Sequence, residues 1–293
     1  MVTVLTAGHV NWDVTLRVDR LPAPDGESRI RSRHQSGGGS AANVAAALAA
    51  LEVDTALVGS VGDDDHGLLA RRELERTGVD LEGVRTVEGG ETAVKYLLVD
   101  DGGEVAILGG NGDNEAIRPS QVDPDRVQSA DHVHLTSQRP ETAARIATLA
   151  REAGVTVSFD PGRRVADRQY DEVLAASDVI FANGNEVTAL FDGEYVDSPY
   201  ADRVVVEKRG SDGAVVHSPS GTCEHAGFDV DPVDTAGAGD AFAAGFIAVR
   251  IDGGGFERAL EYANACGALA ARRTGTQHVP SVDRVGAFLE SRW

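Results

Sequence analysis

From about residue 120 onward, short apolar runs rich in β-branched residues alternate with longer helix-like segments, and this alternation constrains the fold most. The strand candidates are residues 132–135, 155–159, 179–182, 204–207 and 214–217, and the helix candidates are residues 142–153, 170–176, 186–191, 238–249 and 256–273. Strands separated by helices predict βαβ crossovers and a mainly parallel sheet with helices on both faces. The sequence therefore predicts a three-layer, doubly wound α/β fold, with ligands bound at the carboxyl ends of the strands.

The first 112 residues depart from this pattern in two places. Buried strands are predicted at 2–6 and 56–60, and helices at 41–51 and 67–77. Residues 11–36 and 88–112 instead alternate polar with apolar side chains, as strands with one exposed face do. We expect these two segments to pair as a small separate sheet, a lid on a single domain that spans residues 1–293.

Length and cysteine content bound the class of protein. A chain of 293 residues can bury roughly 75% of the surface that its unfolded form exposes, so it needs no disulfide or structural metal. Cys223 and Cys266 lack zinc-ligand spacing and are expected to be free thiols. The N-terminus has no signal-peptide pattern, and no apolar run reaches the roughly 18 residues of a membrane span. We expect a cytoplasmic protein that does not bind membranes.

The charge balance limits the classes of partner that the protein is expected to bind. Lys and Arg total 27 against 47 Asp and Glu, a formal net charge of −20. Such a surface repels phosphate backbones, so nucleic acid is not expected as a partner. Lys95 and Lys208 are the only lysines. Acidity with lysine loss resembles the proteins of halophilic archaea that accumulate salt, although an acidic mesophilic protein rich in arginine would look similar.

The segment from Asp234 to Asp240 carries the clearest chemical signal. It reads Asp-Thr-Ala-Gly-Ala-Gly-Asp and is followed by the apolar run of a buried helix. Small residues at a helix N-terminus leave backbone N–H groups open to an anion, which the helix dipole also stabilises. A carboxylate at this point can accept a proton from a hydroxyl nucleophile. The alternative is that Asp240 only caps the helix.

With this segment the sequence resembles the ribokinase-like (PfkB) carbohydrate kinase family. Residues 234–240 match the second signature of that family, and Gly38-Gly39-Ser40-Ala41-Ala42-Asn43 matches the first. Three intermediate motifs keep the family order: residues 11–13, 183–186 and 210–213. The resemblance extends from residue 1 to about residue 280 and implies the family fold, with the lid closing over the sugar and often forming a dimer contact.

The resemblance implies a role for each matched residue. Asp240 would be the catalytic base, and the backbone of Ala236, Gly237, Ala238 and Gly239 would form the anion hole. The sugar would be bound by Asn11, Asp13, Gly38, Gly39 and Asn43. The nucleotide side would comprise Asn183, Glu186, Lys208, Gly210, Gly213 and Asn264. Glu186 would act on Mg²⁺ through water, and Asp234, with carbonyls near Gly275, would hold K⁺.

Several of these residues have simpler explanations. Asp13 and Asn43 could be turn or helix caps, Glu186 an exposed acid in a first helical turn, and Asn264 a packing residue. Ser40, Thr136 and Lys208-Arg209-Gly210 depart from the usual ribokinase residues, which leaves the sugar open. Lys95, Arg163 and Arg164 could contact a carboxylate or phosphate of the substrate.

The sequence thus predicts an ATP-dependent sugar kinase that phosphorylates a primary hydroxyl, requires Mg²⁺ and forms a homodimer through the lid. One alternative is a nucleoside kinase of the same fold, in which Trp12 would stack on the base. Another is a non-catalytic regulator that binds sugar or nucleotide, although such a protein would not need Asp240. A dinucleotide oxidoreductase is excluded, because no GxGxxG follows the first strand.

Overall fold

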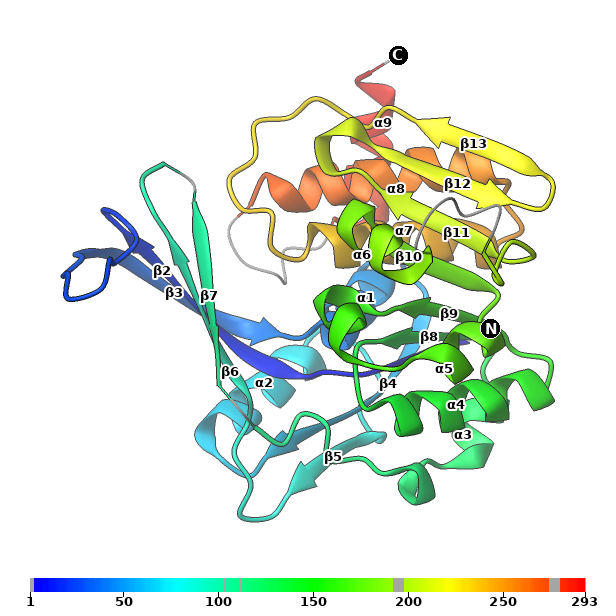
Figure 1. The fold of residues 1–293 in the computed structure, drawn as a ribbon, viewed down its shortest axis with the longest axis horizontal. Helices are drawn as coiled ribbons and strands as arrows, with labels where there is room; N and C mark the ends of the chain where they lie inside the picture. Colours follow the sequence, from blue (N-terminus) through cyan, green and yellow to red (C-terminus); the bar gives the residue numbers. More distant parts are fainter. Residues whose placement is uncertain (1–2, 103, 111, 192–197, 274–279, 293) are drawn as a thin grey trace.

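The computed structural model describes residues 3–102, 104–110, 112–191, 198–273 and 280–292. The strands of its main sheet are β1 (Thr3–Ala7), β4 (Asp54–Gly62), β5 (Val84–Val87), β8 (His132–Thr136), β9 (Thr156–Asp160), β10 (Val179–Asn183), β11 (Val204–Lys208), β12 (Ala214–Ser218) and β13 (Gly221–His225). Among the described residues these nine strands lie in the order β13-β12-β11-β10-β9-β8-β1-β4-β5 (Figure 1).

The main sheet is parallel from β5 to β11, and β12 and β13 extend it antiparallel at one edge. Strands β1 and β10 are mostly apolar, as expected for strands covered on both faces, whereas β8 and β9 also contain buried His and Ser residues. This arrangement confirms the predicted α/β fold class.

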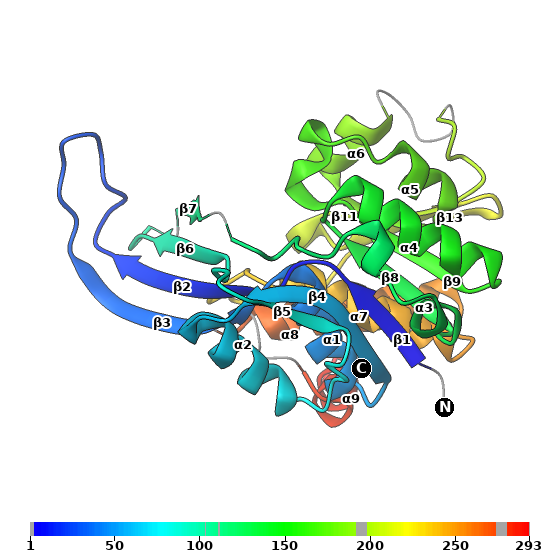
Figure 2. The ribbon, with the colours of Figure 1, turned by 90° about the horizontal axis from the view of Figure 1, so that it is seen from below.

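Helices cover both faces of this sheet. They are α1 (Ser40–Ala50), α2 (Asp65–Glu75), α3 (Pro124–Gln128), α4 (Pro140–Glu152), α5 (Asp171–Ala176), α6 (Gly184–Phe191), α7 (Ala238–Ile251), α8 (Phe256–Ala271) and α9 (Val282–Glu290). Two apolar clusters separate the layers: one joins the sheet to α3, α4 and α5, and the other joins it to α1, α7, α8 and α9. Figure 2 shows these two groups of helices on opposite sides of the sheet.

A second sheet projects from the body beside the carboxyl ends of the central strands (Figure 1). It contains β2 (Asn11–Val18), β3 (Ile30–Gly38), β6 (Val94–Val99) and β7 (Val105–Gly109), in the order β3-β2-β6-β7. The two half-exposed segments of the sequence therefore pair with each other, as predicted, and do not enter the main sheet. We call this sheet the lid. Trp12 and Val14 anchor its base in an apolar cluster with α1, α2 and β4.

Some elements are not predicted by the sequence patterns. These are β5, β13, α3 and α9, which are short or lie at the edge of the fold. None of the described helices is both long and apolar enough to cross a membrane.

Candidate active site

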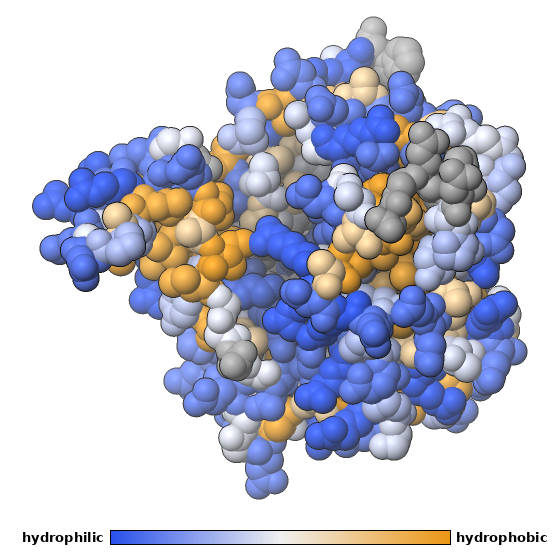
Figure 3. All heavy atoms as spheres, in the orientation of Figure 1, coloured by the Kyte–Doolittle hydropathy of each residue, from blue (hydrophilic) through white to orange (hydrophobic). Residues whose placement is uncertain are grey.

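A cleft of about 740 Å³ lies between the lid and the carboxyl ends of the central strands. The space-filling view shows this hollow between the two parts of the molecule (Figure 3). Ten of the charged and amide side chains that line it are Asp13, Asn43, Lys95, Glu115, Arg164, Asp160, Asn183, Glu186, Lys208 and Asp240. The position is the one expected for a ligand site in an open α/β sheet.

Asp240 lies in the first turn of α7, beside the small-residue loop that precedes the helix. Gly237 caps the helix in the left-handed conformation, with φ of 78°, which glycine adopts without strain. Asp240 is therefore not the helix cap. Its Oδ2 accepts a hydrogen bond of 2.7 Å from Asn43 Nδ2, and burial raises the pKa of its carboxyl to about 6. The first turn of α7 presents backbone N–H groups that have no partner inside the helix.

The loop before α7 is held by its own hydrogen bonds. Ala236 N donates to Asp234 Oδ1 at 3.0 Å, and Ala238 N donates to the Thr235 carbonyl oxygen at 3.2 Å. Ala236, Gly237 and Gly239 line the cleft together with Asp240. The predicted anion-hole residues and the predicted base therefore lie in one place. Asp234 belongs to the same loop, whereas Gly275, named with it for K⁺, lies outside the described residues.

Asp13 and Asn43 also line the cleft, and Gly38, which does not, lies against Asp13. Asp13 lies on β2, and a Cβ at Gly38 on β3 would collide with its carboxylate, so only glycine fits there. Burial raises the pKa of Asp13 to about 6. Asp13 Oδ1 and Asn43 Oδ1 are buried acceptors without a hydrogen-bond partner among the described residues. A ligand with hydroxyl groups would supply the missing donors.

The alternative roles as caps do not hold for two of these residues. The N-cap of α1 is Gly39, with φ of 99°, and Asn43 lies inside the helix with its amide directed to Asp240. A Cβ at Gly39 would collide with the carbonyl oxygen of His9. Asp13 lies within β2 and caps no turn. Both side chains are thus free to act toward a ligand in the cleft.

Asn11 behaves differently from the other predicted sugar-binding residues. It is fully buried and does not line the cleft. When its amide is oriented to satisfy its neighbours, Asn11 Oδ1 accepts from Lys95 Nζ at 3.0 Å. Asn11 therefore supports a cleft residue and does not face the cleft itself.

Asn183, Glu186 and Lys208 converge at the carboxyl ends of β10 and β11. Asn183 N donates to Glu186 Oε2 at 2.8 Å, and Glu186 N donates to Asn183 Oδ1 at 3.0 Å. Glu186 is 5% exposed, which excludes the simple surface acid, and burial raises its pKa. Lys208 Nζ lies 2.5 Å from Asp160 Oδ2; burial opposes its charge, but Asp160 and Glu186 outweigh that effect and raise its pKa.

The remaining predicted nucleotide residues do not line the cleft. Gly210 and Gly213 form the turn before β12, and Gly213 must be glycine because its φ is 80° and a Cβ would collide with the His225 carbonyl oxygen. Asn264 is buried in α8, where its Nδ2 donates to the Leu260 carbonyl oxygen at 2.8 Å. This contact matches the packing interpretation of Asn264.

Trp12 does not have the position expected for stacking on a base. It is 3% exposed, lies in the apolar base of the lid and stacks on His66 with ring centroids 6.0 Å apart. The strand alternation explains this: Asp13 points into the cleft, so Trp12 points to the opposite face. The suggestion that Trp12 binds a nucleobase is wrong.

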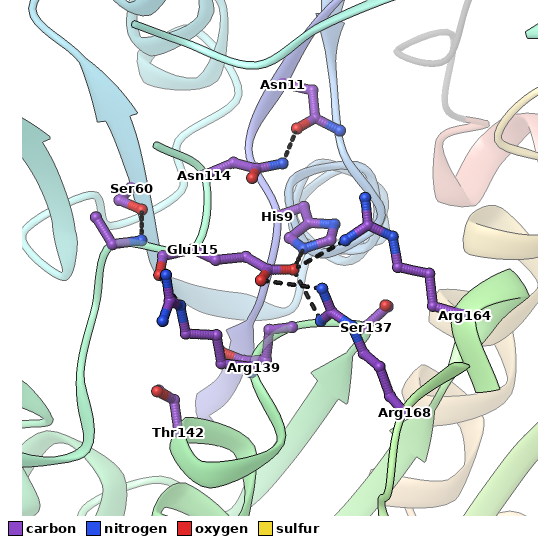
Figure 4. Close-up of polar contacts among 12 residues, drawn as sticks. His9, Asn11, Ser60, Asn114, Glu115, Ser137, Arg139, Thr142, Arg164 and Arg168 are labelled. Carbon is purple, nitrogen blue, oxygen red and sulfur yellow. Dashed lines mark hydrogen bonds and ion pairs between the residues drawn. The ribbon is translucent and has the colours of Figure 1, made fainter. Parts of the chain in front are cut away.

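Sequence reasoning missed a cluster of charged residues at one end of the cleft. Glu115 Oε1 lies 2.5 Å from His9 Nε2, 2.9 Å from Arg168 Nη1 and 3.5 Å from Arg164 Nη1. Figure 4 shows the two arginines reaching Glu115 from one side and His9 from another. We call Glu115, His9, Arg164 and Arg168 the Glu115 cluster. Burial would raise the Glu115 pKa, but its hydrogen bonds with His9 and Arg168 outweigh this and lower it to about 2.

Comparison with known proteins agrees with this geometry. The profile described as pfkB family carbohydrate kinase matches residues 1–283. An ATP-dependent ribose-1-phosphate kinase of Halopiger xanaduensis is 68% identical over 295 residues, covering 100% of both chains. A nucleoside kinase of Methanothermobacter thermautotrophicus is 26% identical over 99% of this chain and 96% of its own. The ribokinase structure from Thermotoga maritima is 26% identical, with a TM-score of 0.88 over 99% of this chain and 100% of that one.

Proposed function

Because the chain belongs to the pfkB family of carbohydrate kinases, we propose that it transfers the γ-phosphoryl group of ATP to the primary hydroxyl of ribose 1-phosphate. The observation that carries this proposal is the 68% identity, over the full length of both chains, to the Halopiger ribose-1-phosphate kinase. The product would be a ribose that carries phosphate at both ends.

The site geometry supports a direct in-line transfer. Asp240, held by Asn43, would take the proton of the primary hydroxyl as that oxygen attacks the γ-phosphorus. The bond from the γ-phosphorus to the bridging oxygen breaks, and ADP leaves with the bonding electrons. The N-terminus of α7 would stabilise the charge on the transferring group. Asp13 and Asn43, with their unsatisfied oxygens, would hold the ribose hydroxyls.

The nucleotide would lie toward Lys208, Asn183 and Glu186. Among the described residues, no group of three or more His, Cys, Asp and Glu side chains is arranged to hold a metal ion. A site with so few protein ligands suits Mg²⁺ that arrives with the phosphates of ATP and keeps most of its water. Glu186 would hold that water shell, and the bound ion would supply positive charge beside the β- and γ-phosphates.

Three further assignments belong to the same proposal. Asp234 would bind K⁺ beside the loop of the anion hole. Two copies would pair through the lid, where the apolar side chains Tyr96 and Leu108 are 41% and 59% exposed. The protein would work in the cytoplasm, where ATP is available.

A substrate panel tests the proposed reaction. Ribose 1-phosphate, ribose, other sugar phosphates and nucleosides would each be offered with ATP and Mg²⁺ in molar KCl, and ADP release measured. We expect ribose 1-phosphate to have the highest kcat/KM and mass spectrometry to find a bisphosphate. A preference for nucleosides would indicate a nucleoside kinase, and binding without turnover on any acceptor would indicate a regulator.

A further inference from the structure

The cleft of this acidic chain contains cations that its own carboxylates do not neutralise. The chain has two lysines, and both Lys95 and Lys208 line the cleft. Lys208 is paired with Asp160. No described carboxylate lies within ion-pair distance of Lys95, whose contact is the amide of Asn11. An unpaired ammonium in a chain that otherwise uses arginine indicates a function that needs it.

Lys95 and Arg164 both line the cleft and come from different parts of the fold. Lys95 extends from β6 of the lid, and Arg164 from the 3₁₀ helix (Gly162–Asp167) that follows β9. Both are among the charges that act on His9, which follows β1. Lys95 also acts on Asp13 and Asp240. Lys95 is therefore close enough to influence both the base and the Glu115 cluster.

The neighbouring arginine points to the other end of the cleft. Arg163 is among the charges that act on Glu186, on the proposed nucleotide side. Arg164 instead lies 3.5 Å from Glu115. The two consecutive arginines thus lie toward different ends of the cleft. The cations near His9 therefore form a site distinct from the one proposed for the ATP phosphates.

The Glu115 cluster holds Arg164 in place without using all of its hydrogen-bond donors. Arg168 makes two contacts with the Glu115 carboxylate, at 2.9 and 3.1 Å, and its side chain is 17% exposed. Arg164 makes one longer contact, and its side chain is 57% exposed. A guanidinium carries five N–H donors, so Arg164 keeps donors for a ligand. One carboxylate between two arginines also leaves net positive charge at this end of the cleft (Figure 4).

We propose that Lys95 and Arg164 bind the phosphate group that the sugar substrate already carries, while Glu115 and Arg168 are positioning residues. This inference rests on the proposed function. It orients the sugar with its free hydroxyl at Asp240 and its phosphate between the lid and the 3₁₀ helix. The same pair of cations selects against an unphosphorylated sugar, which would leave Lys95 without an anionic partner.

The test compares two substrates in three variants. Lys95→Gln and Arg164→Gln each remove one charge, and Arg145→Gln removes an exposed arginine of α4 outside the cleft as a matched control. For each protein, kcat/KM is measured for ribose 1-phosphate and for ribose at saturating ATP in molar KCl. We expect Lys95→Gln and Arg164→Gln to lower the value for ribose 1-phosphate roughly 10- to 100-fold, mainly through KM. The value for ribose should stay within about threefold, because a hydroxyl does not need the charge. Arg164→Lys should recover part of the loss.

The wild-type protein tests the proposed function, and the variants test the phosphate site, so the two proposals can fail separately. Wild-type protein that phosphorylates ribose but not ribose 1-phosphate would overturn the proposed function. Variants that lose both substrates equally, or that raise the KM for ATP instead, would overturn the phosphate site. Melting temperatures in molar KCl would show that each variant is folded.

Discussion

At the scale of single residues, the site combines a buried carboxyl, Asp13, and a half-buried one, Asp240, with the glycines Gly38 and Gly39, where a Cβ would collide with neighbouring atoms. Asp240 and Asp13 have raised pKa values because burial disfavours their charged forms. Sequence motifs locate these residues, since each belongs to a short contiguous signature. The Glu115 cluster has no such signature: its members come from three separate segments that only the fold brings together. Arg164 and Lys95 therefore stand out in the sequence only as cations, without partners.

Replacing the proposed base should lower the activity and raise the stability of the protein. Asp240→Asn keeps the contact with Asn43 but cannot accept a proton, so kcat should fall on the order of 10²–10⁴-fold. A folded pKa of about 6 means that ionised Asp240 destabilises the fold once the pH exceeds its unfolded pKa, and fully above about 6. The free energy of unfolding of the variant should therefore exceed that of the wild-type protein by roughly 1–3 kcal/mol at pH 7.5. Below about pH 4 the two free energies should be equal. Urea titrations at the two pH values, with ADP-release assays, measure both effects; near-normal turnover would contradict the assignment.

The two raised pKa values also predict a steep acid limb in the pH profile. Asp13 binds sugar hydroxyls most strongly when it is ionised and both of its oxygens accept, and Asp240 must be ionised to take a proton. Because both pKa values are about 6, kcat/KM should fall below that pH with a limiting slope approaching two. In Asp13→Asn the residue at position 13 no longer titrates, so only the ionisation of Asp240 remains and the slope should approach one. A slope of one in the wild-type protein would show that only one of these groups must be ionised.

At the scale of elements, the hydrophobic periodicity of the sequence predicts which strands are buried on both faces and which on one. It predicts less about the strands at the edges of a sheet. The central parallel strands and their helices follow from apolar runs and helix spacing. Short edge strands such as β5, which reads Val-Arg-Thr-Val, have too few residues to show a period. The parallel pairing of β2 with β6 joins segments about eighty residues apart, and local sequence holds no information on that register.

The apolar face of the lid predicts how two copies would meet. Tyr96 and Leu108 are paired across β6 and β7, with 41% and 59% of each residue exposed, and they point away from the cleft, since Leu97 and Ile107 line it. Leu108→Asp should convert a dimer to a monomer in light scattering at micromolar concentration, because a charge would be buried in the contact. Val282→Asp, on an exposed residue of α9, is the matched control. A wild-type protein that is already monomeric would rule out the lid contact.

At the scale of the whole molecule, excess negative charge sets the conditions under which the fold is stable. Forty-seven carboxylates against 27 basic side chains repel one another in dilute buffer. The Debye length is about 30 Å at 0.01 M salt and about 3 Å at 1 M, so molar salt removes most of this repulsion. The sequence predicts this behaviour from composition alone, without any knowledge of the fold.

Salt should therefore stabilise the protein, and the kind of salt should separate screening from specific binding. The melting temperature should rise steeply between 0.05 and 1 M KCl, roughly as the Debye length shortens, and activity should be poor below a few tenths molar. NaCl at the same ionic strength should stabilise the fold equally, because screening does not distinguish the two cations. If Asp234 binds K⁺ beside the loop of the anion hole, kcat should be higher in KCl than in NaCl. Equal rates would remove the K⁺ site and leave the kinase assignment intact, whereas a melting temperature that does not change with salt would contradict the halophilic interpretation of the sequence.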